Sequence, residues 1–211
     1  MGGRGLASVE AMLSSVPLVM QFASPELAED ILYGERDWTD DPRWLETGAP
    51  DLAAYGHWAV RWCGIACLRM ALLARDNAAP SLYELAVDAK RYGAYSDAPG
   101  APEGLIYRPF VDYVRVEHRL HAEVATDFTA PELCRPVQEG SLVIASVHPE
   151  IRRPHRPSPG RGGHLLLVTA AETDTVTFND PSGHQPKARV ATLPMATCDT
   201  FFARRGVILH V

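Results

Sequence analysis

Three residues that could do chemistry together each stand where a segment of regular structure is expected to begin or end. Cys63 opens the apolar run CGIACLRMALLA, His164 opens HLLLVTAA, and Asp180 follows TVTFN. A thiol at the start of a helix feels the positive end of the helix dipole, which lowers its pKa and favours the nucleophilic thiolate. An imidazole and a carboxylate could supply a general base and the group that orients it. These residue types therefore indicate nucleophilic catalysis.

Each of these residues also has a purely structural interpretation. A cysteine on an apolar helix often behaves as a small buried hydrophobe, and for this reason we assign Cys67, one turn further along, to the core. A lone histidine is often a satisfied core residue, and the DPSG sequence that contains Asp180 is an ordinary turn. The combination of Cys63, His164 and Asp180, each at the end of an element, favours the catalytic interpretation.

Small residues beside the cysteine and the histidine fit the same hypothesis. Gly64 directly follows Cys63 and would let a substrate backbone approach closely. Gly162 and Gly163 precede His164 and keep side chains away from a base that must touch both nucleophile and substrate. We therefore expect an open approach to both reactive groups.

The segments 164–171 and 175–180 are expected to form an antiparallel hairpin. In such a pair the start of one strand lies beside the end of the other, so Asp180 can reach the His164 ring and fix its tautomer. Asn179 could take this role instead, but successive side chains of a strand point to opposite faces. One of these two neighbours must therefore point away from the histidine.

The expected elements are helices in the first part of the chain and mostly strands in the second. Ser24, Pro25 and Gly34 mark the ends of one helix, and Ser81 with Glu84 forms a capping box at the start of another. Helices are expected over 7–15, 24–34, 63–75, 81–92, 108–117, 129–140 and 193–204, and strands over 118–126, 141–148, 164–171, 175–180 and 206–211. This order predicts an α+β fold with a mostly antiparallel sheet.

The segment 149–163, PEIRRPHRPSPGRGG, is expected to be a loop. Its four prolines and three glycines exclude a helix or a strand interior. Four arginines against one glutamate make it basic. It could gate a cleft or bind an acidic group of a substrate, or it could be a solvated loop.

Composition narrows the class of protein. The chain has 211 residues, 46% hydrophobic and 22% charged, and a net charge of −6. These values predict one globular domain and argue against a general nucleic-acid surface. No apolar run is long enough to span a membrane and no signal cleavage site is convincing, so we expect a mature cytoplasmic protein. The four cysteines are expected to be reduced thiols, and no pair follows at zinc-site spacing, so neither metal nor cofactor is expected.

Several segments together resemble a known family. The segments are WCGIACLRMAL, PSLYELAVDA, GSLVIASV, GGHLLLVTA, VTFNDPSG and FFARRGVILHV. They resemble the papain-like cysteine peptidases of the bacteriocin-processing (double-glycine leader peptidase) type, and more closely their stand-alone bacterial relatives, over roughly Val16 to Val211. The resemblance implies a papain-like fold, with a central nucleophile helix packed on an antiparallel sheet. It also implies that Cys63 is the nucleophile, His164 the general base and acid, and Asp180 the orienting acid.

The family also places a glutamine side chain in the oxyanion hole, upstream of the nucleophile. In compact members this glutamine lies where this chain has His57, whereas VPLVMQF offers Gln21, as in many stand-alone relatives. We favour Gln21, with residues 22–56 looping out, and keep His57 as the second candidate. Residues 1–56 are then an N-terminal extension and 57–211 the catalytic part of one structural domain.

The resulting hypothesis is a cysteine peptidase or amide hydrolase that forms an acyl-enzyme with a peptide or other acyl or amide substrate. One alternative is an acyltransferase, transglutaminase-like or cyclising enzyme, because the same triad can pass the acyl group to an amine or carbon nucleophile. A second alternative is a non-catalytic papain-like binding module. The oligomeric state is left open. The predicted substrate-binding residues are His57, Gly64, Gly163 and Trp62.

Overall fold

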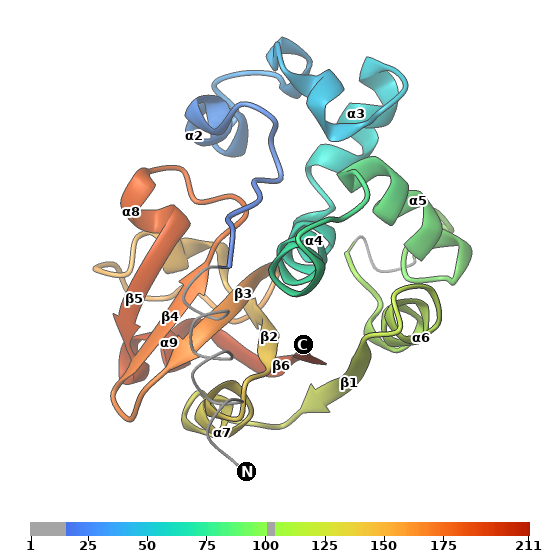
Figure 1. Cartoon of the computed structure of the whole chain (residues 1–211). Helices are drawn as coiled ribbons and strands as arrows, with labels where there is room; N and C mark the ends of the chain where they lie inside the picture. The colour runs from blue at the N-terminus through green and yellow to red at the C-terminus, as the bar shows by residue number, and fades with distance from the viewer. Residues whose placement is uncertain (1–15, 101–103) are drawn as a thin grey trace.

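A computed structural model of the chain describes residues 16–100 and 104–211 (Figure 1). The helix expected over 7–15 lies outside the described residues. The α-helices are α2 (Ala28–Leu32), α3 (Leu52–Ala59), α4 (Cys63–Asp76), α5 (Leu82–Arg91), α6 (Tyr107–Glu117), α7 (Cys134–Gln138), α8 (Pro186–Arg189) and α9 (Met195–Phe201). Short 3-10 helices are η1 (Pro25–Leu27), η2 (Trp38–Asp40), η3 (Trp44–Thr47), η4 (Pro131–Leu133) and η5 (Pro149–Arg152).

The strands form one sheet in the order β1-β6-β2-β3-β4-β5, and every neighbouring pair is antiparallel. Their bounds are β1 (His121–Thr126), β2 (Leu142–Val147), β3 (His164–Ala171), β4 (Thr175–Asn179), β5 (Val190–Pro194) and β6 (Phe202–His210). The predicted α+β class and the predicted antiparallel pairing of β3 with β4 are confirmed.

Helices cover both faces of the central strands. Helix α4 packs on β3 and β2, with α5 beside it, while α7 contacts the same two strands and α9 contacts β4 and β5 (Figure 1). Along β3 the side chains alternate between two hydrophobic cores. Leu165 and Leu167 join the core under α4, whereas Leu166 and Val168 join the core with α7 and α9. A strand buried on both faces needs a continuous apolar run, which explains the sequence HLLLVTAA.

The helix that begins at Cys63 has its apolar character for the same reason. Its residues Ile65, Ala66, Cys67 and Leu68 are fully buried. The core position predicted for Cys67 is therefore confirmed. The predicted capping box of α5 is also present, because the Ser81 hydroxyl accepts from the Glu84 N–H and the Glu84 carboxylate accepts from the Ser81 N–H.

Residues 16–56 share the first core with α4. Phe22 and Tyr55 are buried there. Asp41, which is 1% exposed, accepts hydrogen bonds from the hydroxyls of Tyr55 at 2.6 Å and Ser24 at 2.6 Å. This network holds the turn-rich segment against α3 and satisfies a carboxylate that burial would otherwise penalise.

Several expectations about individual elements differ from the structure. The segment 149–163 was expected to be a loop throughout, but it begins with the 3-10 helix η5. Pro149 suits the first position of this helix, because an N–H there would have no acceptor within the helix. The predicted helix over 193–204 is shorter, and β6 already begins at Phe202. The edge strand β5 was not predicted, because only one face of its short sequence VATLP is partly covered.

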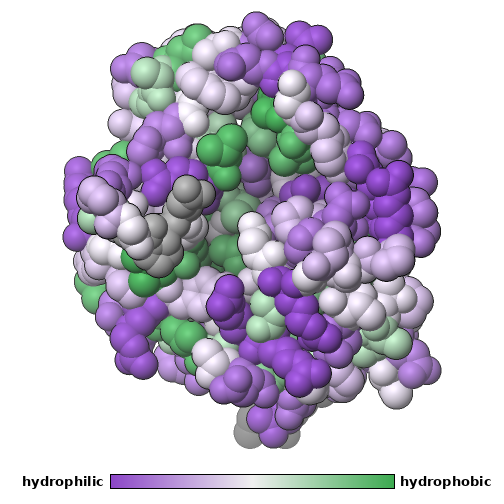
Figure 2. Space-filling view, turned by 180° about the vertical axis from the view of Figure 1, so that it is seen from behind, coloured by the Kyte–Doolittle hydropathy of each residue, from purple (hydrophilic) through white to green (hydrophobic). Residues whose placement is uncertain are grey.

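None of the described helices is both long and apolar enough to cross a membrane. Figure 2 shows the face opposite to that of Figure 1, where hydrophobic residues gather around a hollow near the middle. Polar residues surround this hollow on most sides.

Gly206 lies where β6 passes between β1 and β2. A Cβ at this position would lie 2.2 Å from the Ile144 carbonyl oxygen. Because backbone must move to relieve this contact, we expect Gly206→Ala to lower the free energy of unfolding by about 1–3 kcal/mol. Urea unfolding followed by circular dichroism measures the difference.

Gly104→Ala is the matched control, because no described atom lies within 4 Å of the place that the added methyl group would occupy. Its free energy of unfolding is expected to change by less than about 0.5 kcal/mol. Equal stability of the two variants would contradict the close approach at Gly206.

Candidate active site

Cys63 is the first residue of α4, where the chain turns from α3 into the central helix. Its side chain is partly exposed, whereas its neighbour Trp62 is fully buried. The thiol lies against β3, where it interacts with the His164 ring and the Leu165 N–H, and it also interacts with the Gly64 N–H. The Cys63 thiol is therefore accessible from solvent, and its surroundings stabilise a negative charge on sulfur.

His164 is the first residue of β3 and is 5% exposed. Gly162 and Gly163 precede it with φ angles of +81° and +98°, a conformation that strains any residue with a Cβ. Nε2 of the ring lies 2.7 Å from Asp180 Oδ1. This contact leaves Nδ1 for the Cys63 thiol, so the histidine bridges the sulfur and the carboxylate.

Asp180 directly follows β4 and has no exposed surface. Its Oδ1 also accepts from the Ser182 N–H at 2.8 Å, and its own N–H donates to the Arg189 carbonyl at 2.7 Å. Asn179, the alternative, donates instead to the Val16 carbonyl at 3.2 Å. Because successive side chains point to opposite faces, Asp180 contacts His164 and Asn179 points away from it.

The electrostatics of the three groups favour a thiolate and an imidazolium. Burial alone would raise the pKa of the Cys63 thiol, but the hydrogen bond and charge of His164 and two backbone N–H groups outweigh it and lower the pKa. Burial also acts to lower the pKa of His164, yet the Asp180 carboxylate outweighs burial and the nearby Arg152 charge and raises it. Burial alone would raise the pKa of Asp180, but the charges of His164 and Arg152 hold it far below the ordinary value.

Arg152 is a component of the site that the sequence did not reveal. Its side chain is 5% exposed, and its Nε lies 3.4 Å from Asp180 Oδ2. Its Nη2 donates to the Ser182 hydroxyl, which lies 3.2 Å from Nε2 of His164. The first arginine of the basic segment is therefore a buried counter-ion of the carboxylate and not part of a solvated loop.

Gln21 contacts residues that adjoin Cys63 and Asp180 along the chain. Its N–H donates to the Pro181 carbonyl at 2.7 Å, and its carbonyl accepts from the Trp62 indole at 2.6 Å. Its side-chain Nε2 donates to the Ala59 carbonyl at 3.0 Å. Through Trp62 and Pro181, these contacts tie Gln21 to the chain neighbours of both Cys63 and Asp180.

His57 lies in a different environment. Its side chain is 41% exposed, and Nε2 lies 3.0 Å from Arg61 Nη1 and 3.5 Å from Asp97 Oδ1. The ring also meets Trp58 edge to face. The structure thus places His57 in a surface ion cluster, where burial and the Arg61 charge lower its pKa.

The open approach expected at Gly64 is wrong. A Cβ on Gly64 would lie 2.8 Å from a Leu105 methyl group and 2.9 Å from a Leu165 methyl group, so packed side chains occupy the space assigned to substrate. Trp62 has no exposed surface and instead holds the Gln21 backbone. Gly163 is exposed, and nothing closer than 3.8 Å would meet its Cβ.

The described residues contain no cluster of three or more His, Cys, Asp or Glu side chains arranged to hold a metal ion. The arrangement of Cys63, His164 and Asp180 can support attack by sulfur, with proton transfer through His164.

No family model matches this chain, and a search of curated proteins gave no significant match. The chain is similar in structure to a double glycine motif protease from an AMS/PCAT transporter, solved in complex with the leader peptide, at 16% identity and a TM-score of 0.48 over 72% of this chain and 86% of that one. It is also similar to the peptidase domain of Streptococcus ComA, a bifunctional ABC transporter involved in a quorum sensing pathway, at 13% identity and a TM-score of 0.47 over 71% and 91%. More than a quarter of this chain therefore lies outside each match.

The lowered pKa of Cys63 predicts selective alkylation. At about pH 7 an ordinary thiol is only a few per cent thiolate, so we expect iodoacetamide to modify Cys63 about tenfold faster than the partly exposed Cys134, whose pKa burial raises. Because the His164 charge supports the thiolate, the Cys63 rate should fall less steeply than the Cys134 rate as pH decreases. Peptide mass spectrometry over a time course gives both rates from one sample.

His164→Ala should reduce the alkylation rate of Cys63 to that of Cys134, whereas His155→Ala, at an exposed histidine of the loop before β3, should leave it unchanged. Equal rates for Cys63 and Cys134 in the unaltered protein would overturn the ion-pair interpretation.

Removing Arg152 should affect both stability and titration. Arg152→Met leaves the buried Asp180 carboxylate with one counter-ion fewer, and we expect a loss of about 3 kcal/mol in the free energy of unfolding. Since the folded-state pKa of Asp180 is lowered, this loss is fully present above about pH 4 and shrinks as pH falls below it. The pKa of His164, which Arg152 lowers, should rise in an NMR titration of the ring.

Arg153→Met changes the neighbouring residue, which is 23% exposed at its side chain and pairs with Glu29 and Glu150 instead. It should leave the His164 titration unchanged. A His164 pKa that does not move in Arg152→Met would contradict the proposed coupling.

Proposed function

We propose that this protein is a papain-like cysteine peptidase or amide hydrolase that acts through Cys63, His164 and Asp180 and an acyl-enzyme intermediate. The observation that carries the proposal is the His164 ring, which hydrogen-bonds to a fully buried carboxylate through one nitrogen and faces a partly exposed thiol with the other. A histidine that only filled the core would not need a charged partner on one side and a nucleophile on the other.

In the first half-reaction the Cys63 thiolate attacks the carbonyl carbon of a peptide or other amide. The carbonyl π-electrons move to oxygen, and a tetrahedral intermediate forms. His164 then donates its proton to the leaving nitrogen as the carbon–nitrogen bond breaks, which releases the amine and leaves a thioester on Cys63.

In the second half-reaction His164 accepts a proton from water as the water oxygen attacks the thioester. Collapse of this intermediate releases the carboxylic acid and returns the sulfur to its thiolate form. Asp180 stays ionised throughout and keeps the ring oriented, because its Oδ1 holds Nε2 while Nδ1 exchanges the proton.

The oxyanion is stabilised by the backbone N–H of Cys63 and the side chain of Gln21. The Cys63 N–H belongs to the first turn of α4, whose N–H groups have no intrahelical acceptor. The Gln21 carboxamide carries two N–H bonds, of which one donates to the Ala59 carbonyl. In this proposal the segment before residue 57 supplies one donor, and the catalytic part over 57–211 supplies the rest.

An activated ester tests acylation without knowledge of the natural substrate. We expect p-nitrophenyl acetate to release nitrophenol in a burst equal to the enzyme concentration, and mass spectrometry to find the acetyl group on Cys63. Incubation with a mixture of proteome-derived peptides should then give cleavage products that Cys63→Ala does not produce. Acetylation without peptide cleavage, but with transfer to an added amine, would replace hydrolysis by acyl transfer.

Gln21→Ala and His57→Ala distinguish the two candidate oxyanion donors. Loss of one donor costs about 100-fold to 1,000-fold in kcat in other enzymes, and we expect Gln21→Ala to slow acylation by about this factor. His57→Ala, at the surface cluster, should leave acylation unchanged. Iodoacetamide labelling of Cys63 should be the same in both variants, because alkylation forms no oxyanion, and a normal acylation rate in Gln21→Ala would remove Gln21 from the mechanism.

A further inference from the structure

Arg152, the counter-ion of Asp180, also lines a pocket. This pocket has a volume of about 520 Å³ and is lined by residues of α2, η5, the loop that follows it, β4, α8 and β5. Figure 1 shows α2, α8 and β5 at the same end of the molecule. Neither Cys63, His164 nor Asp180 lines it, so it is separate from the candidate active site. Its volume is within the range of small-molecule sites.

The charges that line the pocket are mostly positive. The pocket is lined by four cationic side chains and by a single carboxylate, that of Glu29. The cations are those of Arg152, Arg153, Arg156 and Lys187. Two of these cations are already matched, since Arg152 pairs with Asp180, and Arg153 lies 3.7 Å from Glu29 and stacks on the Tyr33 ring at 4.0 Å.

Arg156 and Lys187 supply the unmatched charge. Both are exposed and line the pocket, and neither has a carboxylate within ion-pair distance among the described residues. An arginine from the loop after η5 and a lysine from α8 that share one pocket can bind an anion together.

The rest of the wall is partly apolar. Ala191 and Leu193 of β5 line the pocket and are partly exposed. Phe178 and Ile151 also line it but are almost fully buried, so the accessible apolar surface comes mainly from β5.

We propose that this pocket binds a small organic anion, in which a carboxylate lies between Arg156 and Lys187 and an apolar body lies on Ala191 and Leu193. The mixed lining favours such a molecule over a bare inorganic ion, because an ion would leave the apolar wall uncovered. The proposal does not depend on the proposed function, since no catalytic residue takes part in it.

Benzoate is a suitable probe, and its titration into the full chain can be followed by the backbone amide shifts in ¹H–¹⁵N spectra. We expect saturable shifts at residues 151–156 and 184–193. Benzamide has the same ring without the charge, and inorganic phosphate has charge without the ring. Each should bind at least about tenfold more weakly than benzoate. Equal affinity for benzoate and either of these would overturn the mixed character of the site.

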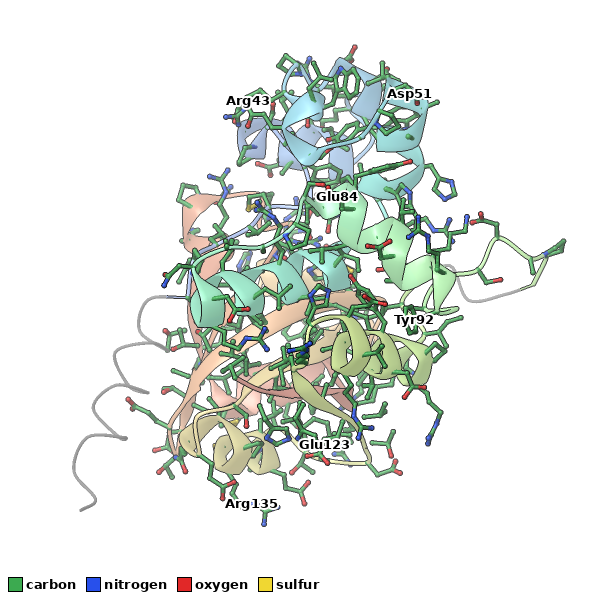
Figure 3. All side chains as sticks on the ribbon, turned by 45° about the vertical axis from the view of Figure 1, so that its right-hand side comes forward. Arg43, Asp51, Glu84, Tyr92, Glu123 and Arg135 are labelled. Carbon is green, nitrogen blue, oxygen red and sulfur yellow. The ribbon has the colours of Figure 1, made fainter. Side chains whose placement is uncertain are left out.

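The variant with Arg156→Gln and Lys187→Gln should weaken benzoate binding about tenfold. Both residues are exposed, so the fold is expected to persist, and the dispersion of the same spectra reports it. Arg135→Gln is the matched control, because this exposed arginine lies on α7 (Figure 3) and does not line the pocket. Unchanged affinity in the double variant, or no saturable shifts in the unaltered protein, would refute the site.

Discussion

The burial of the Asp180 carboxylate is the constraint on which the rest of the site depends. A charge with no exposed surface must be matched by counter-ions and hydrogen bonds, or the group would take up a proton. His164, Ser182 and Arg152 supply these partners from three different segments. Because each partner must approach within a few ångströms of the same two oxygens, the carboxylate fixes where β3 begins, where β4 ends and how the basic segment enters the core.

Arg152 connects two regions with different chemistry. On one side its guanidinium contacts the carboxylate that orients His164, and on the other it lines a basic pocket with an apolar wall. The same buried side chain therefore takes part in the hydrogen-bond network of the carboxylate and borders the pocket. A buried ion pair is a weak source of net stability, but removing one member is strongly destabilising, which favours keeping this arginine in place.

The sequence allowed the helix that begins at Cys63, the central strands and the positions of Cys63, His164 and Asp180 at the ends of elements to be predicted, because apolar periodicity and turn residues are local properties. The choice between Asn179 and Asp180 needed the register of the strand, which pairs Leu167 with Asn179. Arg152 was missed because a run of arginines among prolines has the composition of a solvated loop, and its burial depends on a carboxylate far along the chain. Gly64 was misinterpreted for a similar reason, since the leucine side chains that fill its surroundings come from distant segments.

The contacts that hold Gln21 differ from those that hold the Cys63 thiol beside His164, so the position of the amide and the reactivity of the thiol depend on different parts of the fold. The Gln21 backbone is held by hydrogen bonds to Pro181 and Trp62, whereas the contact of Cys63 with His164 is made by α4 and β3 alone. Local opening of an N-terminal segment costs less than global unfolding. Under the proposed mechanism, a molecule in which this segment has detached would lose the Gln21 amide donor, while the contact of Cys63 with His164 between α4 and β3 would remain. Alkylation of the thiol would then report all folded molecules, whereas the proposed acyl transfer would report only those in which the segment is docked.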